Sequence, residues 1–330
     1  MHKPLPGRDD FDTACGPFTT PPSLRPVRMG EELPFRFAYA SNAFRFYPLP
    51  RVLDLVASAG FDGIELMADV PHLYPPDWRD DAKLAALKRT LDATGLTVTN
   101  LNGYTLFALG DNDSPCWIQD DVEARSVRLA YTREVIELAA RLGAPSLTVM
   151  PGGKLERPDV PQSREQCLER FLSGFRELVP LAGELGVTLL VEPEPECLIE
   201  TVRDFADFLE RLTPEERSVV RMNCDVGHLV CAGDDPASVI LEWRDWIQHV
   251  HLEDIVGRVH DHKILGHGEI NLRAVLDALC RVQYRGWVTI ELYPYQDNPV
   301  EAGQKSLAYL AQLLGSHSSH EARTHLRTVG

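Results

Sequence analysis

The chain has 330 residues, of which 44% are apolar and 25% are charged, and its formal net charge is −16. This composition is typical of a globular protein and excludes collagen-like, membrane-spanning and wholly disordered classes. A strongly acidic chain repels phosphodiester backbones, so we expect no nucleic-acid partner. The seven cysteines form no CxxC pair, and no apolar run reaches the roughly 18 residues of a transmembrane helix. We therefore expect reduced thiols, no membrane contact and a cytoplasmic location.

Strand and helix signals alternate along the chain between two segments without periodicity. Residues 1–33 are rich in Pro, Gly and charge and predict a poorly ordered arm, residues 34–314 predict one domain, and residues 315–330 predict a solvated tail. The predicted strand and helix pairs are 35–40 with 49–59, 63–67 with 80–94, 96–101 with 125–142, 146–150 with 164–185, 187–192 with 201–212, 219–225 with 236–243, 247–252 with 272–282, and 287–292 with 300–314. Glycines directly after predicted helices indicate left-handed C-caps at Gly60, Gly95, Gly143 and Gly186.

Eight alternating strand–helix units predict a parallel sheet covered by helices, and this number suits a closed (β/α)8 TIM barrel. A doubly wound open sheet is the alternative, and it would place its ligands at a single switch point. A barrel instead collects functional side chains from the C-terminal ends of many strands. The two folds therefore differ in where polar residues should follow the strands.

Polar residues do follow four successive predicted strands. Glu192, Asp225, His251 and Glu291 end the fifth, sixth, seventh and eighth strands, each after an apolar run. In a barrel these positions converge on one face near the axis. Three carboxylates and one imidazole, with no thiolate, suit Mn²⁺ first, with Mg²⁺, Co²⁺ or Zn²⁺ as alternatives.

Several segments resemble the xylose isomerase-like TIM-barrel superfamily over about residues 35–314. This group includes sugar isomerases, ketose 3-epimerases, inosose and dehydroshikimate dehydratases, and AP-endonuclease-like repair enzymes. The segments that carry the resemblance are AGFDGIEL (59–66), ATGLTVTNLN (93–102), LLVEP (189–193), NCDVGH (223–228), HVHLED (249–254), GHGEINL (266–272) and YRGWVTIELY (284–293).

The resemblance implies roles for the residues at the strand ends. Glu192, Asp225, His251 and Glu291 would be the metal ligands, and the two glutamates would also transfer protons on opposite faces of the substrate. A metal that holds the carbonyl and hydroxyl oxygens of a sugar would stabilise an enediolate. Glu65, at the end of the second strand, matches an acid of the family, and we expect it to support the ligands from behind.

Further residues are predicted to contact substrate. His228 matches a family histidine that contacts substrate or a second metal, and Arg258 resembles a family arginine that binds a substrate oxygen. His72, in the loop after the second strand, stands where the repair nucleases use a histidine. The loop 104–121 after the third strand is long and carries Trp117, and such loops shape substrate pockets in barrels.

The stretch His260-Asp261-His262 bears on the metal count. The repair nucleases carry Asp-x-His there and bind three zinc ions, whereas this chain has histidine at the first position. Asn102 also replaces a nuclease histidine, so we expect no trinuclear site and assign His262 to substrate contact. We expect His249 to alternate to the opposite face from His251 and to point away from the site.

The leading function is a metal-dependent isomerase or epimerase acting on a sugar or polyol. The alternative keeps the metal and the proton abstraction but ends in elimination, as in a dehydratase or a lyase that cleaves a C-glycoside. A zinc-dependent AP endonuclease and a non-catalytic barrel are the other hypotheses. The resemblance also allows a homo-oligomer.

Overall fold

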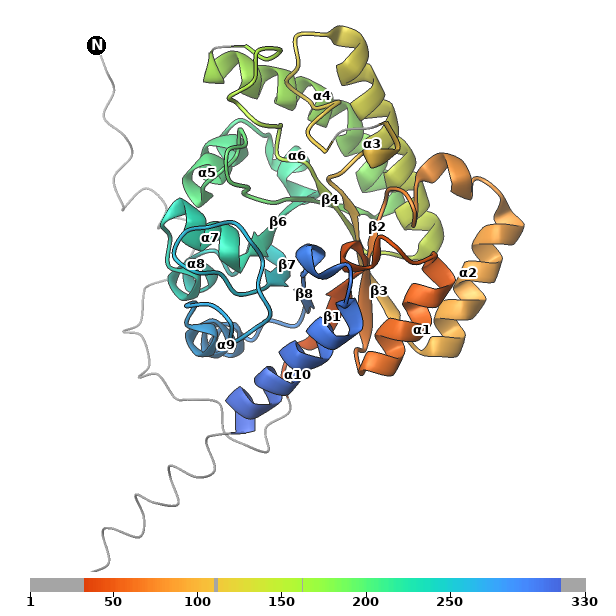
Figure 1. The fold of residues 1–330 in the computed structure, drawn as a ribbon. Helices are drawn as coiled ribbons and strands as arrows, with labels where there is room; N and C mark the ends of the chain where they lie inside the picture. The colour runs from red at the N-terminus through yellow and green to blue at the C-terminus, as the bar shows by residue number, and fades with distance from the viewer. Residues whose placement is uncertain (1–32, 110–111, 162, 316–330) are drawn as a thin grey trace, which may run out of the picture.

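A closed parallel barrel forms the centre of the protein in this computed structural model, which describes residues 33–109, 112–161 and 163–315. Each strand pairs with the next in sequence order, and β1 pairs with β8 to close the barrel (Figure 1). The strands are β1 (Arg36–Ala40), β2 (Gly63–Met67), β3 (Thr97–Gly103), β4 (Ser146–Val149), β5 (Thr188–Val191), β6 (Val220–Asp225), β7 (Ile247–Leu252) and β8 (Trp287–Ile290). The predicted (β/α)8 barrel is confirmed, and the open doubly wound sheet is excluded.

Helices connect the strands and cover the outside of the barrel (Figure 1). They are α1 (Leu49–Ala59), α2 (Asp81–Thr94), α3 (Val122–Leu142), α4 (Arg164–Leu185), α5 (Val202–Glu210), α6 (Pro214–Ser218), α7 (Val226–Ala232), α8 (Pro236–Glu242), α9 (Leu272–Arg281) and α10 (Pro299–Gly315). The short helices α6 and α7 are additions to the predicted set. The four predicted cap glycines all have positive φ, between 68° and 100°.

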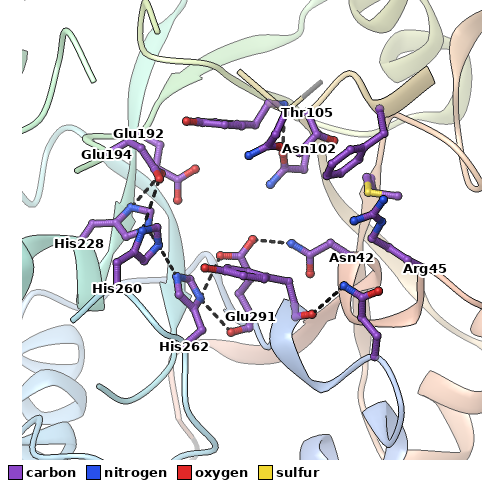
Figure 2. Close-up of a pocket in the computed structure, with 16 residues that line it drawn as sticks. Asn42, Arg45, Asn102, Thr105, Glu192, Glu194, His228, His260, His262 and Glu291 are labelled. Atoms are coloured by element: carbon purple, nitrogen blue, oxygen red, sulfur yellow. Dashed lines mark hydrogen bonds and ion pairs between the residues drawn. The ribbon is translucent and has the colours of Figure 1, made fainter. Parts of the chain in front are cut away.

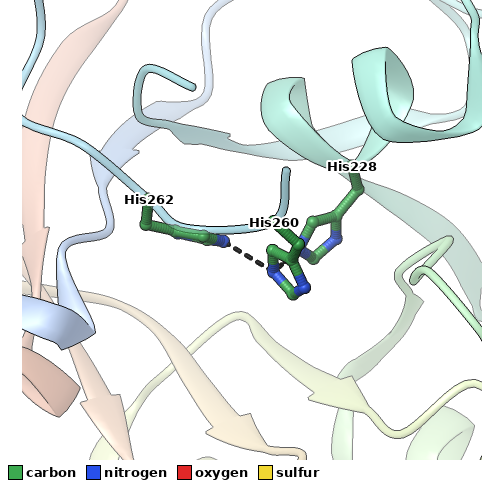
Figure 3. Close-up of side chains that lie close together, drawn as sticks. All are labelled: His228, His260 and His262. Atoms are coloured by element: carbon green, nitrogen blue, oxygen red, sulfur yellow. Dashed lines mark hydrogen bonds between the residues drawn. The ribbon is translucent and has the colours of Figure 1, made fainter. Parts of the chain in front are cut away.

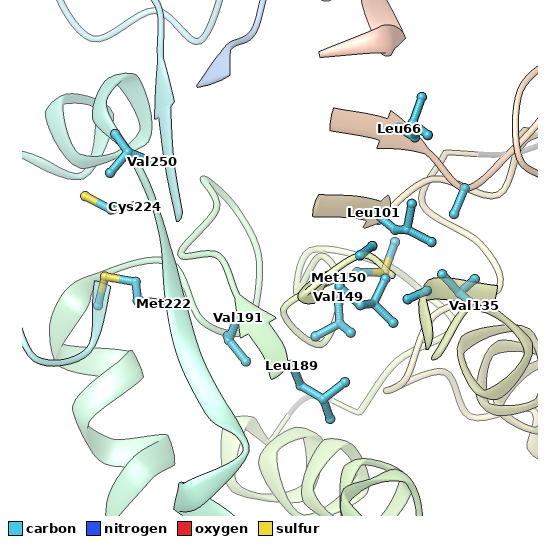
Figure 4. Packing of buried hydrophobic residues seen from close by; sticks show 14 of the residues in the cluster. Leu66, Leu101, Val135, Val149, Met150, Leu189, Val191, Met222, Cys224 and Val250 are labelled. Atoms are coloured by element: carbon cyan, nitrogen blue, oxygen red, sulfur yellow. The ribbon is translucent and has the colours of Figure 1, made fainter. Parts of the chain in front are cut away.

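The apolar core lies between the strands and the helices. Leu66, Leu101 and Val149 point outward from β2, β3 and β4, and Val135 of α3 is buried with them (Figure 4). The alternate positions on these strands face the barrel interior and include the buried polar residues Glu65, Asn100 and Thr148. Asn100, for example, donates hydrogen bonds to Glu65 Oε2 and Thr148 Oγ1. The apolar outer layer therefore holds the barrel together while the interior carries a hydrogen-bonded polar network.

The predicted arm, residues 1–33, and the predicted tail, residues 315–330, lie almost wholly outside the described residues. Across the part of the chain that the structure describes, every helix is too short or too polar to cross a lipid bilayer. Self-association and cytoplasmic location stay predictions.

Candidate active site

The four predicted ligands meet at the C-terminal end of the barrel. His251 Nδ1 lies 2.8 Å from Glu192 Oε1, 3.4 Å from Glu291 Oε2 and 3.7 Å from Asp225 Oδ2. Each side chain is at most 8% exposed. The closed barrel brings the ends of β5, β6, β7 and β8 to one face, so residues separated by up to a hundred positions share one site.

Two carboxylate oxygens in this cluster suit a cation. His251 Nδ1 lies 2.8 Å from Glu192 Oε1 and 3.7 Å from Asp225 Oδ2, but no donor among the described residues is aligned for a regular hydrogen bond to either buried oxygen. Such atoms are costly to bury unless a partner compensates for the lost water. Glu192, Asp225 and His228 can also place ligand atoms within 4.8 Å of one another, as can Asp225, His262 and Glu291. The donor set of oxygens and imidazole nitrogens fits a divalent metal ion.

Neighbouring side chains hold the predicted ligands in position. Glu65 Oε2 lies 2.9 Å from His251 Nε2, and Asn100 and Asn102 donate hydrogen bonds to the Glu65 carboxylate. Asn42, in the 3-10 turn Ser41–Phe44 after β1, donates from Nδ2 to Glu291 Oε1 at 2.8 Å. Glu65 thus occupies the supporting place behind His251 that the sequence predicts.

The ionisable groups of the cluster have strongly perturbed pKa values. Burial raises the pKa of Glu192 to about 8, and the nearby Glu291 and Asp225 add to the rise. Burial also opposes ionisation of Asp225, but the neighbouring His228 and His251 outweigh it and lower the pKa of Asp225. Although burial disfavours its charged form, the pKa of His251 is raised by Glu65, Glu291 and Glu192. Glu192 therefore differs from Asp225, because its raised pKa lets it hold a proton at neutral pH before a cation binds.

A cavity of about 310 Å³ opens beside the cluster (Figure 2). Its wall includes Glu192, Glu291 and the two histidines predicted to contact substrate, His228 and His262. This volume is at the lower end of the range of small-molecule sites. The cavity therefore suits a ligand about the size of a single sugar ring.

Three histidines stand together on one side of the cavity (Figure 3). His260 Nε2 lies 2.9 Å from both His228 Nε2 and His262 Nε2. The sequence prediction treats His260 only as a departure from the nuclease pattern, yet the loop after β7 brings it against the other two. The three imidazoles form one of the groups able to hold a metal ion.

Three residues predicted to contact substrate are not brought to the cavity wall. His72 is buried behind it, with its ring nitrogens 3.1 Å from Ser41 Oγ and 3.3 Å from the Phe44 carbonyl. Trp117 packs edge-on against Phe171 of α4 and is 2% exposed. In each case a side chain predicted to face substrate completes the packing of a loop instead.

Arg258 is the third of these residues. Its side chain is exposed, and its guanidinium lies against Gly233 at the end of α7, where an added Cβ would stand 2.9 Å from one nitrogen. The loop after β7 turns outward at this residue and returns to the cavity at His260. Sequence distance from His251 alone does not reveal that turn.

The prediction for His249 was wrong. His249 and His251 are two residues apart, so the two-residue period of a strand places them on the same face. His249 Nε2 lies 2.9 Å from Glu65 Oε2 and 2.9 Å from Thr289 Oγ1, inside the barrel. Its role is to complete the support around Glu65, and it does not line the cavity.

Several cavity residues escaped the sequence analysis. Glu194 is buried in the wall, and burial together with the charges of Glu192 and Asp225 raises its pKa well above the ordinary value. It stands two residues after Glu192, so the strand-end argument could have included it. The other residues that escaped the sequence analysis are Asn42, Arg45, Met67, Tyr293 and Gln296, whereas Tyr104, Thr105, Phe107 and Asn112 belong to the loop 104–121 that the sequence predicts to shape the pocket.

Known proteins with similar sequences are named as enzymes of sugar-like compounds. The chain is 25% identical over 287 residues to an inosose dehydratase from Geobacillus thermodenitrificans (strain NG80-2), covering 79% of this chain and 88% of that protein. It is 24% identical over 267 residues to 3-dehydro-D-guloside 4-epimerase from Escherichia coli (strain K12), covering 77% and 91%.

The fold is shared with a solved structure of the IolI protein with a bound zinc atom. The TM-score is 0.68 at 20% identity, and the match covers 86% of this chain and 99% of that one. Residues 53–313 match the family described as xylose isomerase-like TIM barrel. The chain therefore belongs to the xylose isomerase-like TIM-barrel family, as its strand-end segments predict.

Proposed function

We propose that this protein is a divalent-metal-dependent dehydratase of a keto-inositol or a closely related keto-sugar. The observation that carries the proposal is the convergence of three buried carboxylates and one buried imidazole beside a cavity of ring size, namely Glu192, Asp225, Glu291 and His251. The relatives named inosose dehydratase favour elimination over the isomerase or epimerase reaction that leads the sequence-based hypotheses.

The four side chains would hold the ion, which would polarise the substrate carbonyl and acidify the adjacent C–H bond when bound. Mn²⁺ suits three carboxylates and one imidazole, and the zinc atom of the IolI structure supports a divalent ion on this fold. The remaining chemistry belongs to the side chains of the cavity.

Glu192 or Glu291 removes the proton from the carbon next to the carbonyl, because both carboxylates line the cavity. The electron pair of that C–H bond then forms a carbon–carbon double bond as the neighbouring C–O bond breaks. Glu194 is suited to give a proton to the departing hydroxyl, which leaves as water. Burial and the neighbouring carboxylates raise the pKa of Glu194 well above its ordinary value, which favours the protonated form that can donate.

Epimerisation is the second candidate. It requires one acid–base group on each face of the substrate, and Glu192 and Glu291 come from strands β5 and β8, separated by two strands. The relative named 3-dehydro-D-guloside 4-epimerase supports this reaction. Both candidates share the proton abstraction and differ in whether the hydroxyl is lost.

Proton NMR in D₂O would separate the two reactions. Manganese-loaded protein is incubated with an inosose and, separately, with a 3-keto-glucoside. A dehydratase yields an unsaturated product that has lost water, whereas an epimerase exchanges a carbon-bound proton for deuterium and returns an intact sugar. We expect dehydration of the inosose, and we expect exhaustive chelation to stop it.

The matched control is the Glu192→Gln chain, loaded and assayed in the same way. Full turnover after chelation, or equal turnover by the Gln variant, would contradict a metal-dependent lyase. Deuterium exchange without water loss would replace it by the epimerase.

A further inference from the structure

The cavity wall carries one strongly basic side chain, on the side away from the predicted metal ligands. Arg45 is the only arginine or lysine among the described residues of that wall. Figure 2 shows it across the cavity from Glu192 and His228. One side of the cavity is therefore rich in carboxylates and imidazoles, which suit a cation, while the opposite side carries a positive charge.

The Arg45 guanidinium has no carboxylate of its own. Within the part of the chain that the structure describes, no oxygen accepts a hydrogen bond from it or forms an ion pair with it. Acceptors are abundant, since the chain has 49 acidic and 33 basic residues, and an arginine such as Arg211 does pair with Glu165. The N–H donors of Arg45 are thus left for solvent or for a ligand in the cavity.

Phe107 supports Arg45 from one face. The guanidinium carbon of Arg45 lies 3.6 Å from the centre of the Phe107 ring, and both side chains line the cavity. A guanidinium that stacks on an aromatic ring keeps its N–H donors available, because they lie in the plane of the group. Stacking also restricts the long side chain, so less conformational entropy is lost when a ligand binds.

Buried polar residues hold the backbone on both sides of this pair. The buried Asp69 carboxylate accepts hydrogen bonds from the Phe107 amide and from Thr105 Oγ1. On the other side, Nε2 of the buried His72 lies 3.3 Å from the carbonyl oxygen of the residue directly before Arg45. The loops after β1 and β3 are therefore anchored where they carry the pair, as a preorganised binding site requires.

We propose that Arg45, stacked on Phe107, binds an anionic substituent of the substrate, a carboxylate or a phosphate on the part of the ring away from the predicted metal ligands. The inference rests on the proposed function for the sugar-like ring and narrows the substrate class to an acidic keto-sugar. A planar guanidinium forms two parallel hydrogen bonds with either group. A neutral inosose still reaches the metal ligands and reacts, but it binds more weakly because Arg45 gains no charged partner.

Binding of locked sugars tests the proposal without turnover. Methyl glucoside, methyl glucuronoside and methyl glucoside 6-phosphate share one ring and differ only at the sixth carbon, and none has the ketone that the proposed reaction needs. Isothermal titration calorimetry with the manganese-loaded full chain measures their dissociation constants. We expect one acid to bind at least about 10-fold more tightly than the neutral glucoside, because its hydrogen bonds to Arg45 are charge-assisted. The acid with the larger preference identifies the group as carboxylate or phosphate.

Arg45→Gln should reduce this preference to about 2-fold or less while the neutral glucoside binds as before. Arg51→Gln is the matched control, since it removes the same charge from an exposed position on α1 that is absent from the cavity wall, and it should keep the full preference. Phe107→Leu removes the aromatic face and should lower the preference by about 2- to 5-fold. Circular dichroism verifies the fold, and Arg45→Met repeats the measurement if the Gln variant is unstable.

Equal affinity for the acids and the neutral glucoside would overturn the proposal, and so would a lack of measurable binding by both acids. An acid preference that persists in the folded Arg45 variants would also overturn it, because the acid would then bind elsewhere, for example at the cation. The proposed dehydration stands or fails separately in the NMR assay. An Arg45-dependent preference without turnover of the inosose would contradict that reaction and still support the acidic substituent.

Discussion

Glu192 and Glu291 lie on the same cavity wall in different protonation environments. Burial raises the pKa of Glu192, whereas His251 outweighs burial at Glu291 and lowers the pKa of that carboxyl. Asn42 additionally donates a hydrogen bond to Glu291 Oε1. Two carboxyls with opposite pKa shifts in one cavity are typical of enzymes that both remove and return protons.

Replacing either carboxyl by its amide should abolish turnover. We expect Glu192→Gln and Glu291→Gln each to lower kcat by at least about 10³-fold, because an amide neither accepts the proton nor ligates a hard cation well. Steady-state kinetics on the metal-loaded proteins provide the measurement. Near-native circular dichroism would show that the loss is chemical.

Glu242→Gln serves as the control, since Glu242 is exposed and absent from the cavity wall. It should match the parent chain in turnover. A Glu192 or Glu291 variant that kept a tenth or more of the activity would remove that residue from the proposed chemistry.

At the residue scale, the sequence predicts the positions of the strand-end side chains better than the positions of side chains in long loops. Glu192 and Glu291 directly follow β5 and β8, and Asp225 and His251 lie near the C-terminal ends of β6 and β7, so strand geometry fixes where they lie. Trp117 and Arg258 are in long loops whose path depends on tertiary packing, and nothing local indicates that one ring turns toward α4 and one guanidinium turns outward.

Helix α5 shows how an individual element is secured beside the site. Thr201 Oγ1 accepts a hydrogen bond from the Asp204 amide, and Asp204 Oδ2 accepts one from the Thr201 amide, which together form a capping box. The preceding loop carries Glu194 into the cavity. The cap therefore fixes the start of α5. The loop that carries Glu194 ends at this point, so the cap also anchors that loop.

Thr201→Ala should weaken this cap. The variant loses the side-chain acceptor, and we expect the free energy of unfolding to fall by about 1 kcal/mol. For a chain of this size that loss lowers the melting temperature by about 2 °C, measurable by differential scanning calorimetry.

Thr90→Ala is the comparison. Thr90 is a half-buried residue within α2 whose hydroxyl donates a hydrogen bond to the Ala86 carbonyl of the same helix. It should leave the melting temperature unchanged or raise it, because alanine has the higher helix propensity. Equal melting temperatures for Thr201→Ala and the parent chain would show that the cap contributes nothing measurable.

At the element scale, apolar spacing and cap glycines predict the long helices well. The predicted bounds of α1 and α4 coincide with those observed, and Gly60 and Gly186 end them in the left-handed conformation. Helix α7 was not predicted, because Val226–Ala232 is too short to display a helical period and follows its strand without a break.

The whole barrel concentrates acidic groups at one end, so metal binding should depend on pH. Glu192 holds its proton up to about pH 8 in the folded metal-free chain, whereas an unperturbed carboxyl loses it near 4.5. The folded state then binds more protons, so this group makes the free energy of unfolding fall as the pH rises between those values. A bound cation displaces the proton from Glu192, so the free energy of unfolding of the metal-loaded chain no longer falls with pH through this group.

The rise in melting temperature caused by Mn²⁺ should therefore grow between about pH 5.5 and about pH 8. Thermal melts with and without Mn²⁺ measure it. Calorimetry in buffers of different ionisation enthalpy should show proton release on binding. In Glu192→Gln both effects should largely disappear, and a pH-independent rise in the parent chain would contradict the raised pKa.

At the scale of the whole molecule, the order of the eight units follows from the sequence because each strand–helix unit carries its own signal. The register of one strand against the next does not follow from the sequence, because it depends on side chains that meet across the barrel. The contacts of Glu65 with both His249 and His251 join β2 to β7 across the interior, and only the closed structure reveals them.

The cavity wall divides along the chain. Its carboxylates and imidazoles all follow β5 to β8, whereas Asn42, Arg45, Asn102 and Phe107 come from the first three units. The carboxylates and imidazoles of the wall thus come from the second half of the barrel, and we propose that the four residues from the first half select the substrate. Exchange of the loops after β1 and β3 with those of a relative should change which substrate the protein prefers. The type of reaction that it catalyses should stay the same.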